Sequence, residues 1–284
     1  HNGGLGDMLY LGVKLGIYPP LIFLGIGTMT DFGPLLSNPV SLLMGAAAQL
    51  GIFIAYTGAR LLGFSGAEAA SIGIIGAADG PTSIVVASQF APQLLGPISV
   101  AAYSYMALVP IIQPPVIRAL TTKRERQIKM EFNEKKVSKT AMILFPILVT
   151  VIAAIIAPIS APLIGLLMFG NLIKECGVLE RLNMAAQNEL SNIVTLLLGI
   201  TIGATMNYAA FLQPVTILIL CLGLVAFVFD TAGGVLFAKL LNLFSKKKVN
   251  PMIGAAGISA FPMSARLVQK MYSKESPGSF ILMQ

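Results

Sequence analysis

The chain has 284 residues, of which 56% are hydrophobic and only 11% are charged, and its mean hydropathy is +0.82. A soluble domain carries roughly 25% charged residues, so the composition predicts an integral membrane protein. The net charge of +7 does not indicate a nucleic-acid partner, because the basic residues cluster in short loops. The only histidine is His1, and both cysteines lie in or beside apolar segments. A histidine-dependent triad, a zinc protease and a disulfide framework are therefore excluded.

Uncharged stretches long enough to span a membrane occur along most of the chain. They cover residues 32–59, 80–117, 140–173 and 190–229, and each exceeds the roughly 20 residues that one spanning helix needs. The chain also contains 28 Gly and 17 Pro. We therefore expect a polytopic all-α helical bundle with broken or re-entrant helices, as is typical of transporters.

The predicted elements follow this pattern in chain order. Helices are predicted at about 9–29, 40–57, 95–117, 141–156 and 162–173. Between the second and third helices, residues 71–90 are apolar but interrupted by Gly and Pro. This pattern predicts two half-helices or a re-entrant hairpin around Asp79.

Basic residues mark the predicted cytoplasmic side. Eight of the 19 Lys and Arg residues lie between Arg118 and Lys139, and three more form the run 246–248. Short loops rich in Lys and Arg face the cytoplasm. We therefore predict that the connector 121–139 and the loop around 246–248 are both cytoplasmic.

An internal comparison indicates a duplication. Residues 27–36 recur as 203–212 at a spacing of 176, and residues 75–79 recur as 253–257 at a spacing of 178. Chance matching of small residues is the alternative explanation. The loop before the second copy is basic, whereas the loop before the first has no Lys or Arg, so equivalent loops are predicted on opposite membrane sides. Such inverted-topology repeats carry their ion site near the bilayer midplane.

The repeat gives the predicted domain organisation. The first membrane repeat covers residues 1–120, the basic cytoplasmic connector covers 121–139, and the second membrane repeat covers 140–284. The chain lacks an initiator Met and stops within an apolar run. We expect it to be a piece of a longer membrane protein.

The first motif, residues 76–82, places Asp79 in the middle of an uncharged stretch. An isolated carboxylate at that depth costs roughly 3 kcal/mol unless it protonates, faces water or pairs with a cation. Backbone carbonyls freed by Gly and Pro, with the hydroxyls of Thr82 or Ser83, would add the oxygen ligands that an alkali cation prefers. The alternative is a structural Asp that caps a half-helix.

The second motif, residues 250–266, combines neutral oxygen donors with one guanidinium. Asn250 and Ser259 could bind a cation, and Arg266 could bind a carboxylate bidentately. Alternatively, Arg266 is an interfacial side chain that extends its charge to water. Tyr105 follows the first motif, and by itself it would be an ordinary helix-interior tyrosine.

At these motifs the sequence resembles the membrane-embedded beta subunit of the sodium-translocating, biotin-dependent decarboxylases, which include oxaloacetate, methylmalonyl-CoA and glutaconyl-CoA decarboxylases. The resemblance covers nearly the whole chain. The matching segments are 20–23, 29–35, 75–82, 102–110, 169–172 and 250–266. Family members also have further hydrophobic sequence before this region and another helix after it.

The resemblance implies a role for each of the singled-out residues. It makes Asp79 the central sodium and proton residue. Catalysis would involve Asp79, Tyr105 and Arg266, with Arg266 also contacting carboxybiotin. The sodium ligands would be Asp79, Asn250, Gly254 and Ser259.

The implied function is that of a membrane subunit that decarboxylates carboxybiotin and couples CO2 release to outward sodium transport with proton consumption. Implied partners are a carboxyltransferase (alpha) subunit, a biotin carrier subunit, a small membrane-anchor subunit and membrane lipid, in an oligomer in the bacterial inner membrane. The alternatives are a secondary cation/proton antiporter and a non-catalytic membrane anchor for a soluble enzyme.

Overall fold

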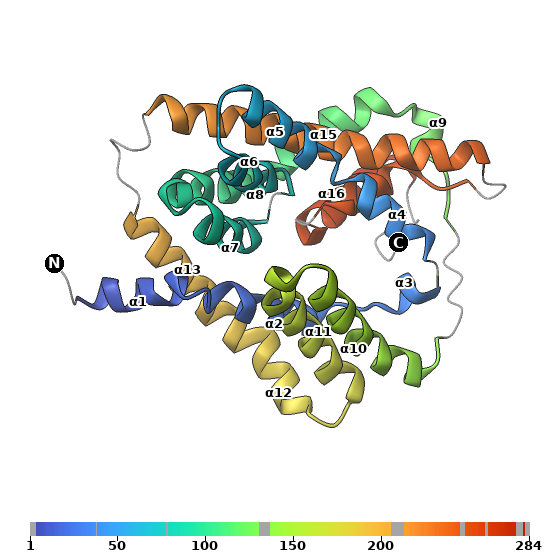
Figure 1. Cartoon of the computed structure of the whole chain (residues 1–284). Helices are drawn as coiled ribbons and strands as arrows, with labels where there is room; N and C mark the ends of the chain where they lie inside the picture. Colours follow the sequence, from blue (N-terminus) through green and yellow to red (C-terminus); the bar gives the residue numbers. More distant parts are fainter. Residues whose placement is uncertain are drawn as a thin grey trace. The chain divides into compact units, whose positions relative to one another are not determined.

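The computed structural model describes residues 4–37, 39–77, 79–130, 137–205, 213–244, 248–258, 261–276 and 281. All regular elements in these ranges are helical, and the ranges contain no strand (Figure 1). The chain divides into two compact units. Unit 1 comprises His1–Ser37 and Lys135–Asn207, and unit 2 comprises Asn38–Glu134 and Tyr208–Gln284. Each unit therefore combines segments from both halves of the sequence.

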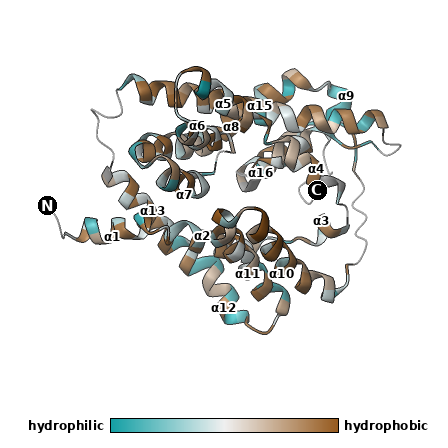
Figure 2. Ribbon diagram, in the orientation of Figure 1, coloured by the Kyte–Doolittle hydropathy of each residue, from teal (hydrophilic) through white to brown (hydrophobic). Residues whose placement is uncertain are grey.

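Several helices are suited to cross a membrane. Within the described ranges, five helical segments are long and apolar enough, and a bent pair, 5–14 with 18–29, would make a sixth. The five are Leu42–Leu61, Pro92–Leu120, Lys139–Ile156, Pro158–Cys176 and Pro214–Phe244. Only 6% of the apolar window of Lys139–Ile156, labelled α10 in Figure 2, is buried. Such an exposed apolar surface requires lipid around it, and this confirms the predicted all-α membrane protein.

Unit 1 is built around a close crossing of two helices. Its elements are α1 (Leu5–Lys14), α2 (Tyr18–Met29), α3 (Gly33–Ser37), α10 (Lys139–Ile156), η3 (Pro158–Ser160), α11 (Ala161–Cys176), α12 (Glu180–Ala185), the π-helical turn η4 (Ala186–Leu190) and α13 (Ser191–Thr205). Gly27 of α2 and Gly170 of α11 leave no room for a Cβ between the two backbones. The carbonyl of Thr30, which ends α2, accepts from Asn171 Nδ2 at 2.9 Å and Lys174 Nζ at 3.0 Å. These bonds satisfy a carbonyl that a helix end would otherwise leave unpaired.

Unit 2 is organised by one long helix, α15 (Pro214–Phe244). The other elements are α4 (Val40–Ala47), α5 (Leu50–Leu61), α6 (Gly66–Gly73), η1 (Ile74–Ala77), α7 (Gly80–Phe90), η2 (Pro92–Leu94), α8 (Leu95–Leu120), α9 (Lys123–Arg126), η5 (Pro251–Gly257) and α16 (Phe261–Glu275). Helices α4, α5, α6 and α8 pack against α15, as do the short helices η1 and η5. Figure 1 shows the orange α15 running alongside the blue α5.

The observed helices correct one of the predicted elements and refine another. The single helix predicted at 9–29 is wrong, because α1 and α2 are bent by 65° and Gly16 adopts a left-handed φ of 67° between them. The helix predicted at 40–57 corresponds to the membrane-length segment Leu42–Leu61, which a turn at residues 48–49 divides into α4 and α5. The break around Asp79 is confirmed, because η1 ends at Ala77 and α7 begins at Gly80.

The two copies of the duplicated motif have similar local structures. Residues 74–77 form the 3-10 helix η1 and precede α7, whereas residues 251–257 form the 3-10 helix η5 and precede α16. This similarity supports the duplication. The inverted topology of the repeats at 1–120 and 140–284 stays a prediction, and these repeats do not coincide with the two compact units.

Candidate functional site

Both motifs rest on one face of α15 that carries small residues. A Cβ on Gly76 of η1 would lie 2.6 Å from the Cβ of Ala226 and 2.6 Å from Asp230 Oδ2. Gly254 of η5 packs against the backbone of Gly234 with no room for a Cβ. Because 226, 230 and 234 are four residues apart, they lie on successive turns of one face. The sequence motifs are therefore neighbours along α15.

Asp79 lies in the break between η1 and α7. It is the N-cap residue of α7, and its extended backbone conformation directs the chain into that helix. Thr82 Oγ1 donates a hydrogen bond to Asp79 Oδ2, and Ser83 Oγ donates to the Asp79 carbonyl at 2.8 Å. The side chain approaches the first turn of α7 but forms no cap hydrogen bond of standard geometry. The carboxylate is partly buried, and the ion pairs of the described residues do not include it.

Two tyrosines of α8 contact different parts of unit 2. The ring of Tyr103 packs at Gly80, where an added Cβ would lie 2.6 Å from its Cζ atom. Tyr105 is 5% exposed, and its hydroxyl donates to the Leu220 carbonyl on α15. The predicted residue Tyr105 therefore ties α8 to α15, whereas Tyr103 lies beside the first motif.

Asp230 was missed by the sequence analysis, although it lies on α15 opposite the first motif. It is fully buried, and Oδ1 accepts a hydrogen bond of 2.5 Å from the Gly51 N–H. Its Oδ2 atom is buried without a hydrogen-bond partner. The signal that identified Asp79, an acid within a long apolar run, is also present at Asp230. Asp230 ends an uncharged stretch that was read only as a membrane span.

Asn250 is fully buried and connects η5 to the connector after α9. Its Nδ2 donates to the carbonyls of Arg126 at 2.9 Å and Ile128 at 3.1 Å. Its Oδ1 accepts from the Met252 N–H at 3.1 Å and thereby caps η5. The amide that the sequence nominates as a sodium ligand is therefore also a structural anchor of the second motif.

A second polar network joins η5 to α8, α15 and α16. Gln113 Nε2 donates to the Ala255 carbonyl at 3.0 Å and to Thr231 Oγ1 at 3.4 Å, and Ser264 Oγ donates to Gln113 Oε1 at 2.6 Å. The side chains of Gln113, Thr231 and Ser264 are fully buried. Gln113 is an amide in a largely apolar helix, and its role was not predicted from the sequence.

The two remaining predicted site residues are Arg266 and Ser259. Arg266 lies on α16 and is exposed. Ser259 lies outside the described residues. The structure therefore places Gly76 of η1 and Gly254 of η5 on neighbouring turns of α15, while the roles of Asp79, Tyr105, Asn250, Gly254, Ser259 and Arg266 stay predictions.

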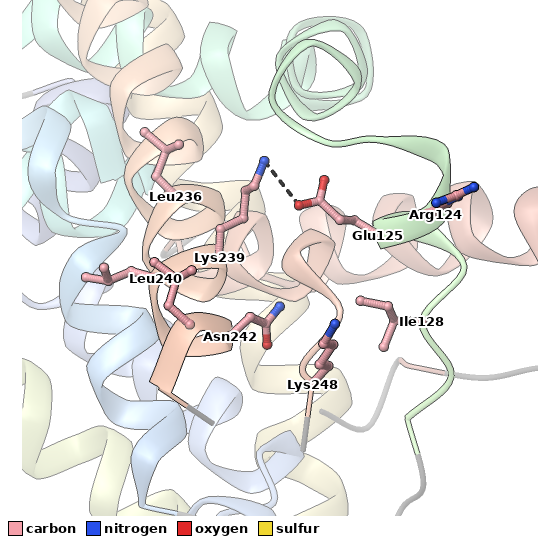
Figure 3. A pocket seen from close by; sticks show the side chains of 9 residues that line it. Arg124, Glu125, Ile128, Leu236, Lys239, Leu240, Asn242 and Lys248 are labelled. Atoms are coloured by element: carbon pink, nitrogen blue, oxygen red, sulfur yellow. Dashed lines mark ion pairs between the residues drawn. The ribbon is translucent and has the colours of Figure 1, made fainter. Parts of the chain in front are cut away.

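The structure also contains a cavity of about 570 Å³ at one end of α15 (Figure 3). Its lining residues are Arg124, Glu125, Ile128, Leu236, Lys239, Leu240, Asn242, Leu243 and Lys248. Lys239 Nζ pairs with Glu125 Oε1 at 3.2 Å. Burial acts to raise the pKa of Glu125, but hydrogen bonds from Thr122 and the charge of Lys239 lower it overall. The predicted site residues that the structure describes, Asp79, Tyr105, Asn250, Gly254 and Arg266, do not line this basic cavity.

The broken helices and buried carboxylates define a class of protein. Such features in a multi-pass membrane bundle are typical of proteins that move ions across membranes.

The sequence comparisons agree with this class and identify a particular family. The family described as "Na+-transporting oxaloacetate decarboxylase beta subunit" matches residues 2–284. The chain belongs to this family of sodium-transporting decarboxylase beta subunits and is a multi-pass protein of the bacterial inner membrane, as the sequence predicted.

Individual relatives come from several decarboxylases. The chain is 57% identical to the methylmalonyl-CoA decarboxylase subunit beta of Propionigenium modestum, with 99% of this chain and 71% of the relative aligned. It is 53% identical to the glutaconyl-CoA decarboxylase subunit beta of Acidaminococcus fermentans, over 99% and 74%. It is 54% identical to the probable oxaloacetate decarboxylase beta chain of Vibrio cholerae, over 97% and 66%. Similar identities to three enzymes with different names mean that these comparisons do not select one substrate.

Proposed function

We propose that this chain is the membrane subunit of a sodium pump that decarboxylates carboxybiotin carried by a partner. The release of CO2 drives sodium outward, and a proton is consumed in exchange. Moving one charge against 100 mV costs about 2.3 kcal/mol. The family membership supports sodium transport and decarboxylation, and the geometry of Asp79 supports the way in which the two are coupled.

The position of Asp79 is the observation that carries the proposal. Its partly buried carboxylate accepts from the hydroxyl of Thr82 and has no ion-pair partner among the described residues. A carboxylate in an apolar membrane segment must be neutralised by a proton or a cation, or reach water. Sodium and a proton therefore compete for Asp79. This competition makes the exchange of one for the other obligatory.

The other predicted residues would act around this exchange. Exposed Arg266 would receive the carboxylate of carboxybiotin as a bidentate partner. Asn250 Oδ1 accepts one hydrogen bond from the protein, and its second lone pair could bind sodium. Gly254 and Ser259 would provide further oxygen ligands, and Tyr105 would deliver the proton.

The proposed complex contains the partners that the family resemblance implies. A carboxyltransferase subunit would load biotin on a carrier subunit, and a small membrane-anchor subunit would join both to this chain. The assembly would be oligomeric and embedded in lipid. The acid or acyl-CoA that is decarboxylated would be selected by the carboxyltransferase.

The test compares Asp79→Asn and Asp79→Glu in vesicles that contain the assembled complex. Carboxybiotin decarboxylation and sodium uptake are measured together. Asp79→Asn keeps the size and removes the charge, so we expect both activities to fall at least 100-fold while assembly is preserved. Asp79→Glu keeps the charge and should retain weak activity with a higher sodium requirement.

Asp7→Asn is the matched control, because it makes the same chemical change at an exposed position of α1. It should leave both activities unchanged. Full activity of Asp79→Asn would contradict the proposal. Sodium/proton exchange by the purified chain alone, without any biotin carrier, would instead support the antiporter alternative.

A further inference from the structure

Asp230 is a fully buried acid that the proposed mechanism does not use. It lies within α15, the 31-residue helix at the centre of unit 2. Its two oxygens differ, because Oδ1 accepts from the Gly51 N–H at 2.5 Å while Oδ2 has no hydrogen-bond partner. A buried carboxylate with one unpaired oxygen is strongly destabilising unless its charge is neutralised.

The elements around Asp230 do not provide that neutralising charge. The described parts of α4, η1 and η5 contain no charged residue. Arg60 lies nine residues after Gly51 on α5, about 13 Å along the helix, and Nη1 donates to the Phe64 carbonyl. Lys239 is equally far from Asp230 on α15 and pairs with Glu125. The ion pairs of the described residues do not include Asp230.

The elements packed against α15 also contribute the neutral or acidic groups Tyr56, Glu68, Tyr103 and Tyr105 and the basic residue Arg118, and α15 itself contributes Cys221. Asp79 follows η1, and α16, which follows η5, carries Arg266, Lys270 and Lys274 besides Tyr272 and Glu275. The ion pairs of the described residues join none of these basic groups to Asp230. Arg118 belongs to the last turn of α8, the helix that ends at Leu120. Among the described residues, no basic group therefore pairs with Asp230, and a cation from the solution can take that role.

The free oxygen of Asp230 faces the first motif. A Cβ on Gly76 would lie 2.6 Å from Oδ2, and Gly76 precedes Asp79 by three residues. The bonded oxygen meets the first turn of α5, where unpaired N–H groups and the helix dipole stabilise negative charge. Asp230 therefore contacts two places where helices are broken, the start of α5 after α4 and the 3-10 helix η1.

We propose that Asp230 is a second binding site for a monovalent cation in unit 2, with Oδ2 as its open ligand. The occupant is sodium or the proton that exchanges with it. This inference rests on the proposed function and adds a second carboxylate to the ion path. Binding at Oδ2 changes the charge beside Gly76 and the strength of the bond to Gly51, so it is coupled to the geometry of the first motif.

The variant Asp230→Asn separates cation binding from a purely structural role. The amide oxygen can still accept from the Gly51 N–H, but the amide neither takes up a proton nor carries a charge for sodium. Two quantities are measured on the purified complex: radioactive sodium binding, and proton release when sodium is added in weak buffer. If sodium is the occupant, its apparent affinity should fall at least tenfold. If the proton is the occupant, proton release should fall while sodium affinity stays near that of the wild type.

Two further variants make the outcome unambiguous. Asp7→Asn should match the wild type in both measurements. If Asp79→Asn abolishes transport while Asp230→Asn matches the wild type in both measurements, Asp230 is only a hydrogen-bond acceptor and this inference fails alone. If Asp79→Asn is also unchanged, the proposed function fails as well.

If Asp230→Asn does not assemble, a different variant still tests the inference. In that case sodium binding and proton release are followed in Asp79→Asn, which retains Asp230. Residual sodium-specific binding or residual proton release would support the second site. Loss of both would overturn it.

Discussion

The two 3-10 helices that rest on α15 differ in how completely their polar neighbours are hydrogen-bonded. Around η5, the side chain of Asn250 makes three hydrogen bonds, and Gln113 binds Ala255 and Ser264. Around η1, Asp79 accepts from Thr82, and Asp230 has one oxygen without a partner. The described buried polar side chains around η5 are thus more completely hydrogen-bonded, whereas the two acids around η1, Asp79 and Asp230, keep more free binding capacity.

This difference indicates a division of roles between similar local structures. A fully bonded buried network fixes one geometry and is costly to disturb. An acid with unpaired oxygens inside a membrane lowers the stability of the folded protein, and such acids commonly bind ions. Substitutions around η5 should therefore affect stability first, and substitutions of the acids near η1 should affect ions first.

The largest effect on stability is expected from Gly254→Ala. A Cβ there would collide with the backbone of Gly234, which cannot move without shifting α15. We expect the free energy of unfolding in detergent to fall by about 3 kcal/mol. In Gly76→Ala the new Cβ would lie 2.6 Å from the Ala226 Cβ and 2.6 Å from Asp230 Oδ2, which are side-chain rather than backbone atoms, so the loss should be smaller, about 2 kcal/mol. Equal losses in the two variants would remove the proposed difference between the motifs.

Asn250→Ala should destabilise the chain by a similar amount, through lost hydrogen bonds rather than a steric clash. The change removes the side-chain partner of the Arg126 carbonyl and of the Met252 N–H, and leaves the Ile128 carbonyl with only the 3.3 Å hydrogen bond from the Tyr272 hydroxyl. Each unpaired buried group costs about 1–3 kcal/mol, partly offset where water enters, so we expect a loss of about 3 kcal/mol in denaturant unfolding. Asn188→Ala is the control, because its exposed amide bonds only within its own helical segment. A loss below about 0.5 kcal/mol in Asn250→Ala would contradict its anchoring role.

The smallest effect on stability is expected at the exposed N-terminal cap of α6, the helix that precedes η1. Ser65 and Glu68 form a capping box on α6, whereas η5 is capped by buried Asn250. Hydrogen bonds to the Glu68 carboxylate lower its pKa from the ordinary value of 4.5; the largest contribution comes from the Ser65 backbone N–H and the next from the Gln93 side chain. A lowered pKa stabilises the folded chain above pH 4.5, and this contribution is lost as the pH falls through the folded pKa.

Glu68→Gln should therefore flatten the dependence of stability on pH below about pH 5. The change should be under about 1 kcal/mol, since the group is exposed and screened. It is measured by thermal unfolding between pH 7 and pH 3.5. An unchanged pH profile would show that this exposed cap contributes nothing measurable.

The sequence predicted the break at Asp79 because Gly80 and Pro81 interrupt an apolar run, and both are local signals. It did not predict the bend between α1 and α2, which depends on the left-handed Gly16. Nor did it reveal the state of Asp230, whose partner Gly51 is 179 residues away in sequence. The bonds of Asn250 are equally non-local. Local composition therefore located the motifs, but only tertiary contacts distinguish a satisfied polar group from one that is free to bind.

The most direct test of this distinction is whether sodium stabilises the purified chain through Asp79. A ligand at 100 times its dissociation constant adds about 2.7 kcal/mol to the folded state. Thermal unfolding is compared in sodium chloride and in potassium chloride. We predict that sodium specifically stabilises the wild type, and that Gln113→Leu unfolds at a lower temperature but keeps the sodium response. Asp79→Asn should keep the stability in potassium and lose most of the sodium response. A full sodium response in Asp79→Asn would contradict the assignment of the ion site to the first motif.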